Sequence, residues 1–335
     1  MNVRHVALKA LRGGKPEKVP WNIHHQLLRR GTLERALRNA GLSIVDKGHS
    51  AYFSITENVS TESKTVLESG LVTTYTRYHT PVGTLTGKQA TGPDGSPWVK
   101  EYPVKKLQDL AVLEFITQDT AHYPDYESIL QAQKDLGDDG IVVSRMLRSP
   151  LQRLLTEWMG VETFVFLHND YPEPVEHLLE TIAGNDRPAF EITARSPAEV
   201  VWSAENITSS ITSPRLFESY CRPYYNRMAE ILHSEGKLYG LHLDGNLAAL
   251  VDSPAHTRID FIEGLNPPPM GDVSIADARA VWPGKVLWVN FPGCVLLSDD
   301  EGVIMYFARE LLKQGMEGGS FLLTLTEDFP IRNGA

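Results

Sequence analysis

The chain has 335 residues, is 42% hydrophobic and 22% charged, and carries a formal net charge of -10 at pH 7. An acidic chain repels phosphate backbones, which makes nucleic acid a poor partner. The two cysteines, Cys221 and Cys294, form no C-x-x-C pair, which excludes a disulfide framework. Neither a signal peptide nor an apolar run of about 20 residues, as a membrane span needs, is visible. We therefore expect a cytoplasmic protein that binds neither membrane nor nucleic acid.

The first hundred residues change character halfway. A helical segment ends at Gly13-Gly14, a short apolar run at 19–23 closes on His24 and His25, and a helix is expected at 32–40. Residues 50–103 alternate in polarity and are rich in β-branched and aromatic residues. Turn signals near 81–83 and 92–95 divide this segment, which predicts a hairpin-rich insertion.

From residue 104 onward, helical and short apolar segments alternate, which predicts parallel strands joined by helices. The helices are expected at 104–116, 124–136, 150–159, 172–183, 213–235, 274–281 and 299–314. Strands are expected at 141–143, 200–202, 237–241, 259–262, 286–289 and 321–323. Strands that are apolar almost throughout are typical of a sheet buried on both faces.

Together with the run at 19–23, these segments give seven strands, and an eighth is expected at 161–167 or 191–195. The count favours a closed barrel over an open sheet, and no G-x-G-x-x-G or P-loop motif supports the latter. The fold predicted is α/β: a single (β/α)8 TIM barrel over residues 1–335 with the hairpin insertion at 50–103.

Polar side chains follow nearly every apolar run. In a parallel barrel all strand C-termini meet on one face, where the active sites of this fold lie. We predict Glu263, Asn290 and Glu205 as catalytic residues. The substrate-binding candidates are His24, Arg145, Arg148 and Asn206.

Several of these residues also have a purely structural explanation. Arg145 and Arg148 are slightly better explained as a surface pair, and Glu263 could be a solvated loop residue. Only one of His24 and His25 can face inward.

His242 and Asp244 lie two residues apart, so both point to one side of an extended chain. They are able to chelate one divalent metal, with zinc favoured, or to form one hydrogen-bonded pair. Glu327, after the last strand, is the third predicted ligand. The alternative is that Asp244 caps the following helix.

Several motifs resemble the uroporphyrinogen decarboxylase superfamily over about residues 15–330. They are Ser213-Pro214-Arg215-Leu216-Phe217, Arg222-Pro223-Tyr224-Tyr225, His242-Leu243-Asp244-Gly245, Thr326-Glu327-Asp328-Phe329-Pro330 and Val19-Pro20-Trp21. The resemblance implies a (β/α)8 barrel. It also implies either cofactor-free decarboxylation of a tetrapyrrole or zinc-assisted methyl transfer involving a corrinoid on a separate protein.

Two departures narrow this choice. The arginine-rich loop of the decarboxylases reads Asn22-Ile23-His24-His25-Gln26 here, and Asp244 replaces the cysteine of the thiol methyltransferases. The sequence therefore resembles the subgroup proposed to demethylate methoxylated small molecules, with methyl transfer to a corrinoid-carrier protein. A metal or an acid such as Glu263 would assist the leaving oxygen. A homodimer is the oligomer that the resemblance implies.

Two other functions stay open at this point. A metal-free decarboxylase would direct Arg145 and Arg148 into the pocket. A non-catalytic binding protein on a reused barrel would leave no pocket, because a fold alone does not prove activity.

Overall fold

The computed structural model describes residues 2–28, 30–92, 95–317 and 320–325, and these residues form two compact units. The first unit comprises residues 2–52, 124–147 and 190–325, and the second comprises residues 53–123 and 148–189, each with the gaps just given. No helix in the described ranges is long and apolar enough to cross a membrane.

Eight parallel strands of the first unit close into a barrel in the order β1-β14-β13-β12-β11-β10-β9-β2. They are β1 (Trp21–His24), β2 (Leu42–His49), β9 (Gly140–Met146), β10 (Val200–Ser203), β11 (Leu238–His242), β12 (Phe261–Leu265), β13 (Val286–Phe291) and β14 (Phe321–Leu325). The predicted (β/α)8 barrel is thus confirmed.

The barrel interior is apolar at the strand starts. Val200, Phe261 and Val286, each the first residue of its strand or close to it, share one buried cluster with residues of α1 (Val3–Leu11). Helix α1 begins at Asn2, whose side chain accepts a hydrogen bond from the backbone N–H of His5. It contacts β2, β9 and β14. Helix α1 therefore packs against the apolar layer formed by the starts of the strands.

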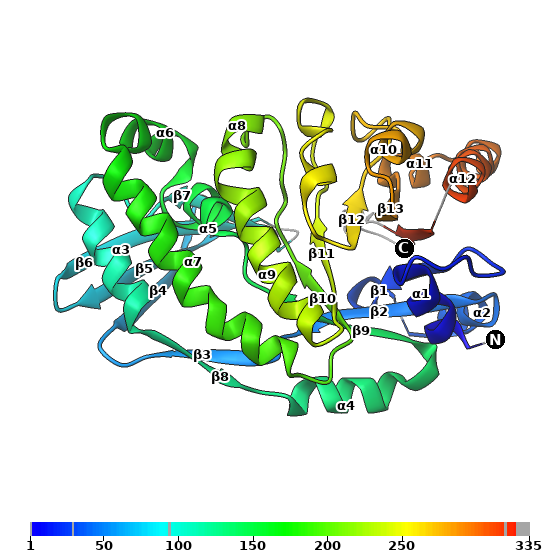
Figure 1. Ribbon diagram of the computed structural model, residues 1–335, viewed down its shortest axis with the longest axis horizontal. Helices are drawn as coiled ribbons and strands as arrows, with labels where there is room; N and C mark the ends of the chain where they lie inside the picture. The colour runs from blue at the N-terminus through cyan, green and yellow to red at the C-terminus, as the bar shows by residue number, and fades with distance from the viewer. Residues whose placement is uncertain (1, 29, 93–94, 318–319, 326–335) are drawn as a thin grey trace. The chain divides into compact units, whose positions relative to one another are not determined.

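The remaining helices of the first unit connect consecutive strands. They are α2 (Thr32–Asn39), α4 (Glu127–Leu136), α8 (Pro214–Leu216), α9 (Arg222–Ser234), α10 (Ile275–Val281), α11 (Gly293–Leu296) and α12 (Glu301–Met316). A π-helical turn at Phe217–Cys221 joins α8 to α9. Helix α9 runs beside β11 (Figure 1) and buries its tyrosine-rich face, including Tyr224 and Tyr225.

The second unit contains the hairpins that the sequence predicts. Its antiparallel sheet has the order β4-β5-β6-β7. The strands are β4 (Ser60–Glu68), β5 (Leu71–Thr80), β6 (Gly83–Thr91) and β7 (Pro97–Glu101), and β3 (Tyr52–Thr56) pairs with β8 (Thr120–Pro124). Its helices are α3 (Gln108–Asp119), α5 (Pro150–Arg153), α6 (Gly160–Asp170) and most of α7 (Pro172–Ala194), with a π-helical turn at Leu154–Trp158.

The predicted position of the eighth strand is wrong. Residues 161–167 belong to α6, and residues 191–195 form the last turn of α7 and the residue after it, whereas the missing strand is β2. Strand β2 reads Leu-Ser-Ile-Val-Asp-Lys-Gly-His. Its second half is polar because it enters the site, so it lacks the continuous apolar run that identifies its neighbours.

Candidate functional site

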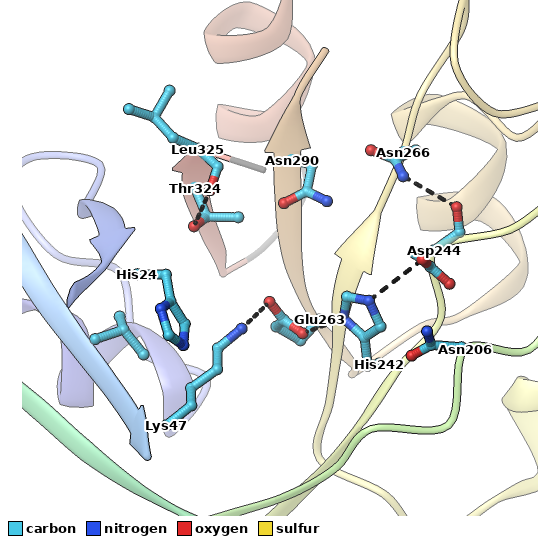
Figure 2. A pocket seen from close by; sticks show the side chains of 11 residues that line it. His24, Lys47, Asn206, His242, Asp244, Glu263, Asn266, Asn290, Thr324 and Leu325 are labelled. Atoms are coloured by element: carbon cyan, nitrogen blue, oxygen red, sulfur yellow. Dashed lines mark hydrogen bonds and ion pairs between the residues drawn. The ribbon is translucent and has the colours of Figure 1, made fainter. Parts of the chain in front are cut away.

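A cavity of about 110 Å³ lies at the carboxyl ends of the barrel strands (Figure 2). All of its lining residues belong to the first unit: His24, Val45, Lys47, Asn206, His242, Asp244, Glu263, Asn266, Asn290, Thr324 and Leu325. Polar groups from seven of the strands, or from the segments directly after them, thus converge as the barrel prediction requires.

Strand periodicity explains this convergence. Alternate residues of a strand point to the same face, so Lys47 lies above Val45 and Glu263 lies above Phe261 on the inner face. The lower residue of each pair belongs to the buried apolar cluster, and the upper one lines the cavity. The carboxyl end of the barrel is therefore a polar layer on an apolar one.

Glu263 is the centre of the polar layer. Its Oε1 accepts a hydrogen bond from Nζ of Lys47 at 2.6 Å, and its Oε2 accepts from Nε1 of Trp202 at 2.8 Å. Nδ1 of His242 is 2.5 Å from the same Oε2. Burial alone would raise the pKa of Glu263, but Lys47 and His242 outweigh burial and hold it well below its usual range. Glu263 is therefore a buried carboxylate anion.

His242 lies between two carboxylates. Its Nδ1 faces Glu263, and its Nε2 lies 3.5 Å from Oδ2 of Asp244 (Figure 2). Burial alone would lower the pKa of His242, but Glu263 and Asp244 outweigh burial and raise it to about 10. The ring is thus an imidazolium at neutral pH.

Gly264 makes room for this ring. Its φ is +81°, and a Cβ at this position would collide with the imidazole of His242. A residue with a side chain would be strained there for both reasons.

Asp244 does not cap the segment that follows it. The amides of Leu247 and Ala248 donate instead to Oδ1 of Asp272, at 2.6 and 3.1 Å. The half-buried Asp244 carboxylate lines the cavity beside His242. The structure therefore favours the paired arrangement of His242 and Asp244 over the capping alternative.

Three asparagines add amide groups to the cavity wall. Asn206 adopts the left-handed conformation with φ +53° and donates its backbone N–H to the carbonyl of His242 at 3.1 Å. Asn266 donates its side-chain amide to the carbonyl of Asp244 at 3.0 Å, and the buried Asn290 donates to that of Gly264 at 3.4 Å. These amides fix the loops that carry the cavity.

The two histidines at the end of β1 differ in their surroundings, although their rings stack with centroids 4.8 Å apart. His24 lines the cavity, on the side of Lys47 (Figure 2), whereas Nδ1 of His25 lies 3.3 Å from Asp46.

Several predicted site residues do not line the cavity. Glu205 is completely buried but is not among the lining residues. Arg145 is exposed and also does not line the cavity. Arg148 belongs to the second unit, where it pairs with Glu157 at 2.8 Å. Glu327 lies outside the described residues.

Sequence reasoning missed three polar cavity residues, Lys47, Asn266 and Thr324, and the two apolar ones, Val45 and Leu325. Lys47 is only 7% exposed, and its ammonium lies 4.6 Å from the ring centroid of Trp202. The available signal was its spacing of two residues from the apolar Val45, which becomes informative only once β2 is recognised as a strand.

The described residues do not fit a zinc centre built by the protein alone. No three His, Cys, Asp or Glu side chains in these ranges are grouped to hold a metal ion. Glu263 is already bound by three donors, which leaves His242 and Asp244 as two ligands where a structural or catalytic zinc needs at least three. Zinc at this site stays a prediction.

Comparisons with known proteins agree with the architecture. A methyltransferase from Methanosarcina mazei is similar in fold, with a TM-score of 0.59 at 14% identity over 98% of this chain and 94% of that one. The EAL enzyme Bd1971, in its form with cAMP and cyclic-di-GMP bound, matches with a TM-score of only 0.24 at 8% identity, over 83% of this chain and 61% of that one. A similarity that low supports no argument, and no curated protein matches the chain.

A family model assigns the chain more directly. The model described as "Uroporphyrinogen decarboxylase (URO-D)" matches residues 4–326, which is nearly the whole sequence and includes every described residue of the cavity. The resemblance seen in the sequence motifs is thereby confirmed, and the chain belongs to the uroporphyrinogen decarboxylase family.

Proposed function

We propose that this chain is a methyltransferase that removes the methyl group of a methoxylated small molecule and passes it to a corrinoid held by a partner protein. The observation that carries the proposal is the position of His242, held between Glu263 and Asp244 on the wall of a small polar cavity. The fold similarity to a methyltransferase supports the same reaction class.

Cleavage of a methyl ether needs a proton for the leaving oxygen, because an alkoxide or phenolate is a poor leaving group. As the carbon–oxygen bond breaks, its electron pair stays on the oxygen, which takes the proton from Nε2 of His242 and leaves as a hydroxyl group. A reduced corrinoid on the partner protein would supply the electron pair for the new bond to the methyl carbon. Nε2 is 3.5 Å from Asp244, longer than an ordinary hydrogen bond, so a substrate oxygen can compete for this proton.

The residues behind His242 keep it ready for this role. The hydrogen bond from Nδ1 to Glu263 fixes the ring orientation and directs Nε2 away from the core. Lys47 and Trp202 in turn hold the two oxygens of Glu263. Lys47 and Trp202 act through Glu263, so we assign them as positioning residues and His242 as the catalytic acid.

The cavity lining favours a compact, uncharged reacting group. Amide and imidazole groups of Asn206, Asn266, Asn290 and His24 line the walls, and none of the described lining residues is an arginine. A decarboxylase acting on several carboxylates would need cations free to bind them. Lys47 is instead bound to Glu263. Methyl transfer therefore fits this cavity better than decarboxylation.

The test supplies the purified chain with cob(I)alamin and a panel of aromatic and aliphatic methyl ethers under anaerobic conditions. We expect demethylated product by mass spectrometry together with methylated corrinoid by absorbance, and loss of both in His242→Gln. The matched control is His233→Gln, because His233 also pairs with a carboxylate, Asp260 at 2.8 Å, but does not line the cavity. Carbon dioxide released from carboxylated substrates, with no demethylation of any ether, would show that the chain is a carboxy-lyase.

Metal analysis tests the zinc prediction separately. Stoichiometric zinc in the wild type that is lost in His242→Ala would place a metal at this site, with its remaining ligands outside the described residues.

A further inference from the structure

The sheet of the second unit has a long open edge. Strand β4 is at the end of the order β4-β5-β6-β7. All nine of its residues pair with β5 without a register shift, and the strand contains no proline. Most of its residues are exposed, and in the described part of the chain no strand pairs with its outer side. Natural proteins usually protect such an edge with a bulge, a proline, a short strand or charged side chains, and of these β4 has only the charged side chains.

We propose that this edge binds the same edge of a second copy of the chain, with β4 antiparallel to β4 and Ser63 opposite Ser63 on the two-fold axis. The two four-stranded sheets then form one continuous sheet. The proposal concerns a surface outside the cavity and does not depend on the proposed reaction.

Charge decides the register. When two copies pair about Ser63, Glu62 of each copy faces Lys64 of the other, which makes two opposite-charge pairs on one face of the sheet. Lys64 has no ion-pair partner among the described residues, whereas Glu62 has only His79, at 3.4 Å. The Ser63 register therefore gives the free lysine a carboxylate.

The neighbouring registers are unfavourable. In a symmetric antiparallel pair, facing residues lie on the same side of the sheet only if the two-fold axis passes at a residue and not between two residues. Pairing about Lys64 would set that lysine against itself, and pairing about Thr65 would set Glu62 against Glu68. Like charges that are directly opposite each other destabilise a strand pair.

Apolar contacts support the same arrangement. Leu67 is 74% exposed, the largest exposure among the big hydrophobic residues of the described chain. In the Ser63 register, Leu67 of one copy faces Val59 of the other, and Thr61 faces Thr65. The dimer thus covers a leucine that the single chain leaves in water.

The first experiment measures the mass of the full chain by light scattering across a concentration series. We expect a dimer for the wild type and monomers for Glu62→Lys and for Lys64→Glu. The double variant, with both changes, should restore the dimer, because the charges are then exchanged but still complementary. Lys100→Glu, on the opposite edge strand β7, is the control and should leave the dimer intact.

The second experiment tests the register. Ser63→Cys is oxidised with copper phenanthroline in a Cys294→Ser background, because Cys294 is the exposed cysteine, and Thr65→Cys is the matched control on the same face. We expect a cross-linked dimer for position 63 only. A monomer at all concentrations, a dimer that is indifferent to both charge reversals, or cross-linking at position 65 in place of 63 would overturn the proposal.

Discussion

Replacing Lys47 with methionine removes the buried cation that holds Glu263. The two side chains are 7% and 2% exposed and their charged atoms are 2.6 Å apart, so neither charge is solvated. Removing one partner of such a pair typically costs about 3–5 kcal/mol, because the other charge stays buried. Since His242 and Trp202 still bind Glu263, we expect the lower end, about 3 kcal/mol. Methionine keeps the length of the side chain, so little packing is lost.

The assay is urea unfolding followed by tryptophan fluorescence, with Lys88→Met as the matched control. Lys88 pairs with Glu68 at 2.8 Å, but the two side chains are 28% and 39% exposed, and such surface pairs contribute little to stability because solvent screens them. Adding Glu263→Gln to Lys47→Met should recover part of the loss, because the unpaired charge is then gone. If Lys47→Met costs no more than Lys88→Met, the buried ion pair is not the support that we assign to it.

Three further outcomes follow from the geometry of the same layer. Gly264→Ala should lower the free energy of unfolding by at least about 1–2 kcal/mol because of the left-handed backbone alone, and it should lower kcat because His242 is displaced. An active variant of unchanged stability would contradict the close approach of Gly264 to His242. Trp202→Phe removes one hydrogen bond to Glu263 and should lower stability by about 1.5–3 kcal/mol, measured by the same unfolding assay, whereas a neutral effect would mean that this bond is replaced. Because the pKa of His242 is raised to about 10 in the folded state, the folded chain binds more protons above its unfolded value of about 6.5. Stability should therefore fall as the pH rises from about 6.5 to 10, and His242→Gln should flatten that part of the pH profile.

The fold could be predicted from the sequence because seven of the strands contain recognisable apolar runs that alternate with helices. The eighth could not, because β2 changes from apolar to polar at Asp46, where it leaves the core and enters the site. A strand that contributes functional residues loses the pattern by which buried strands are recognised. The same feature hid Lys47.

The site was predicted in part for a similar reason. His242, Asp244, Glu263 and Asn290 follow recognisable apolar runs, and the structure brings all of them to one cavity. A residue that follows a strand can line the cavity or be buried elsewhere, and the sequence does not distinguish these two cases. Glu205 is an example, because it follows a strand but does not line the cavity.

The chemical roles of these residues were harder to predict from the sequence than their positions. A histidine two residues before an aspartate predicts metal binding and ion pairing equally well. The choice depends on Lys47 and Trp202, which come from strands distant in sequence and occupy the oxygens of Glu263. Only the closed barrel reveals that this carboxylate is already bound.

The central claim is that His242 gives its proton to the leaving oxygen, and the most direct measurement is how demethylation rates depend on that oxygen. Single-turnover rates are compared for wild type and His242→Gln, with an alkyl methyl ether and with a nitrophenyl methyl ether whose phenolate leaves without a proton. We predict a loss of about 10²- to 10⁴-fold for the alkyl ether and a much smaller loss for the nitrophenyl ether. Equal losses for the two ethers, or none for either, would contradict the assignment of His242 as the acid.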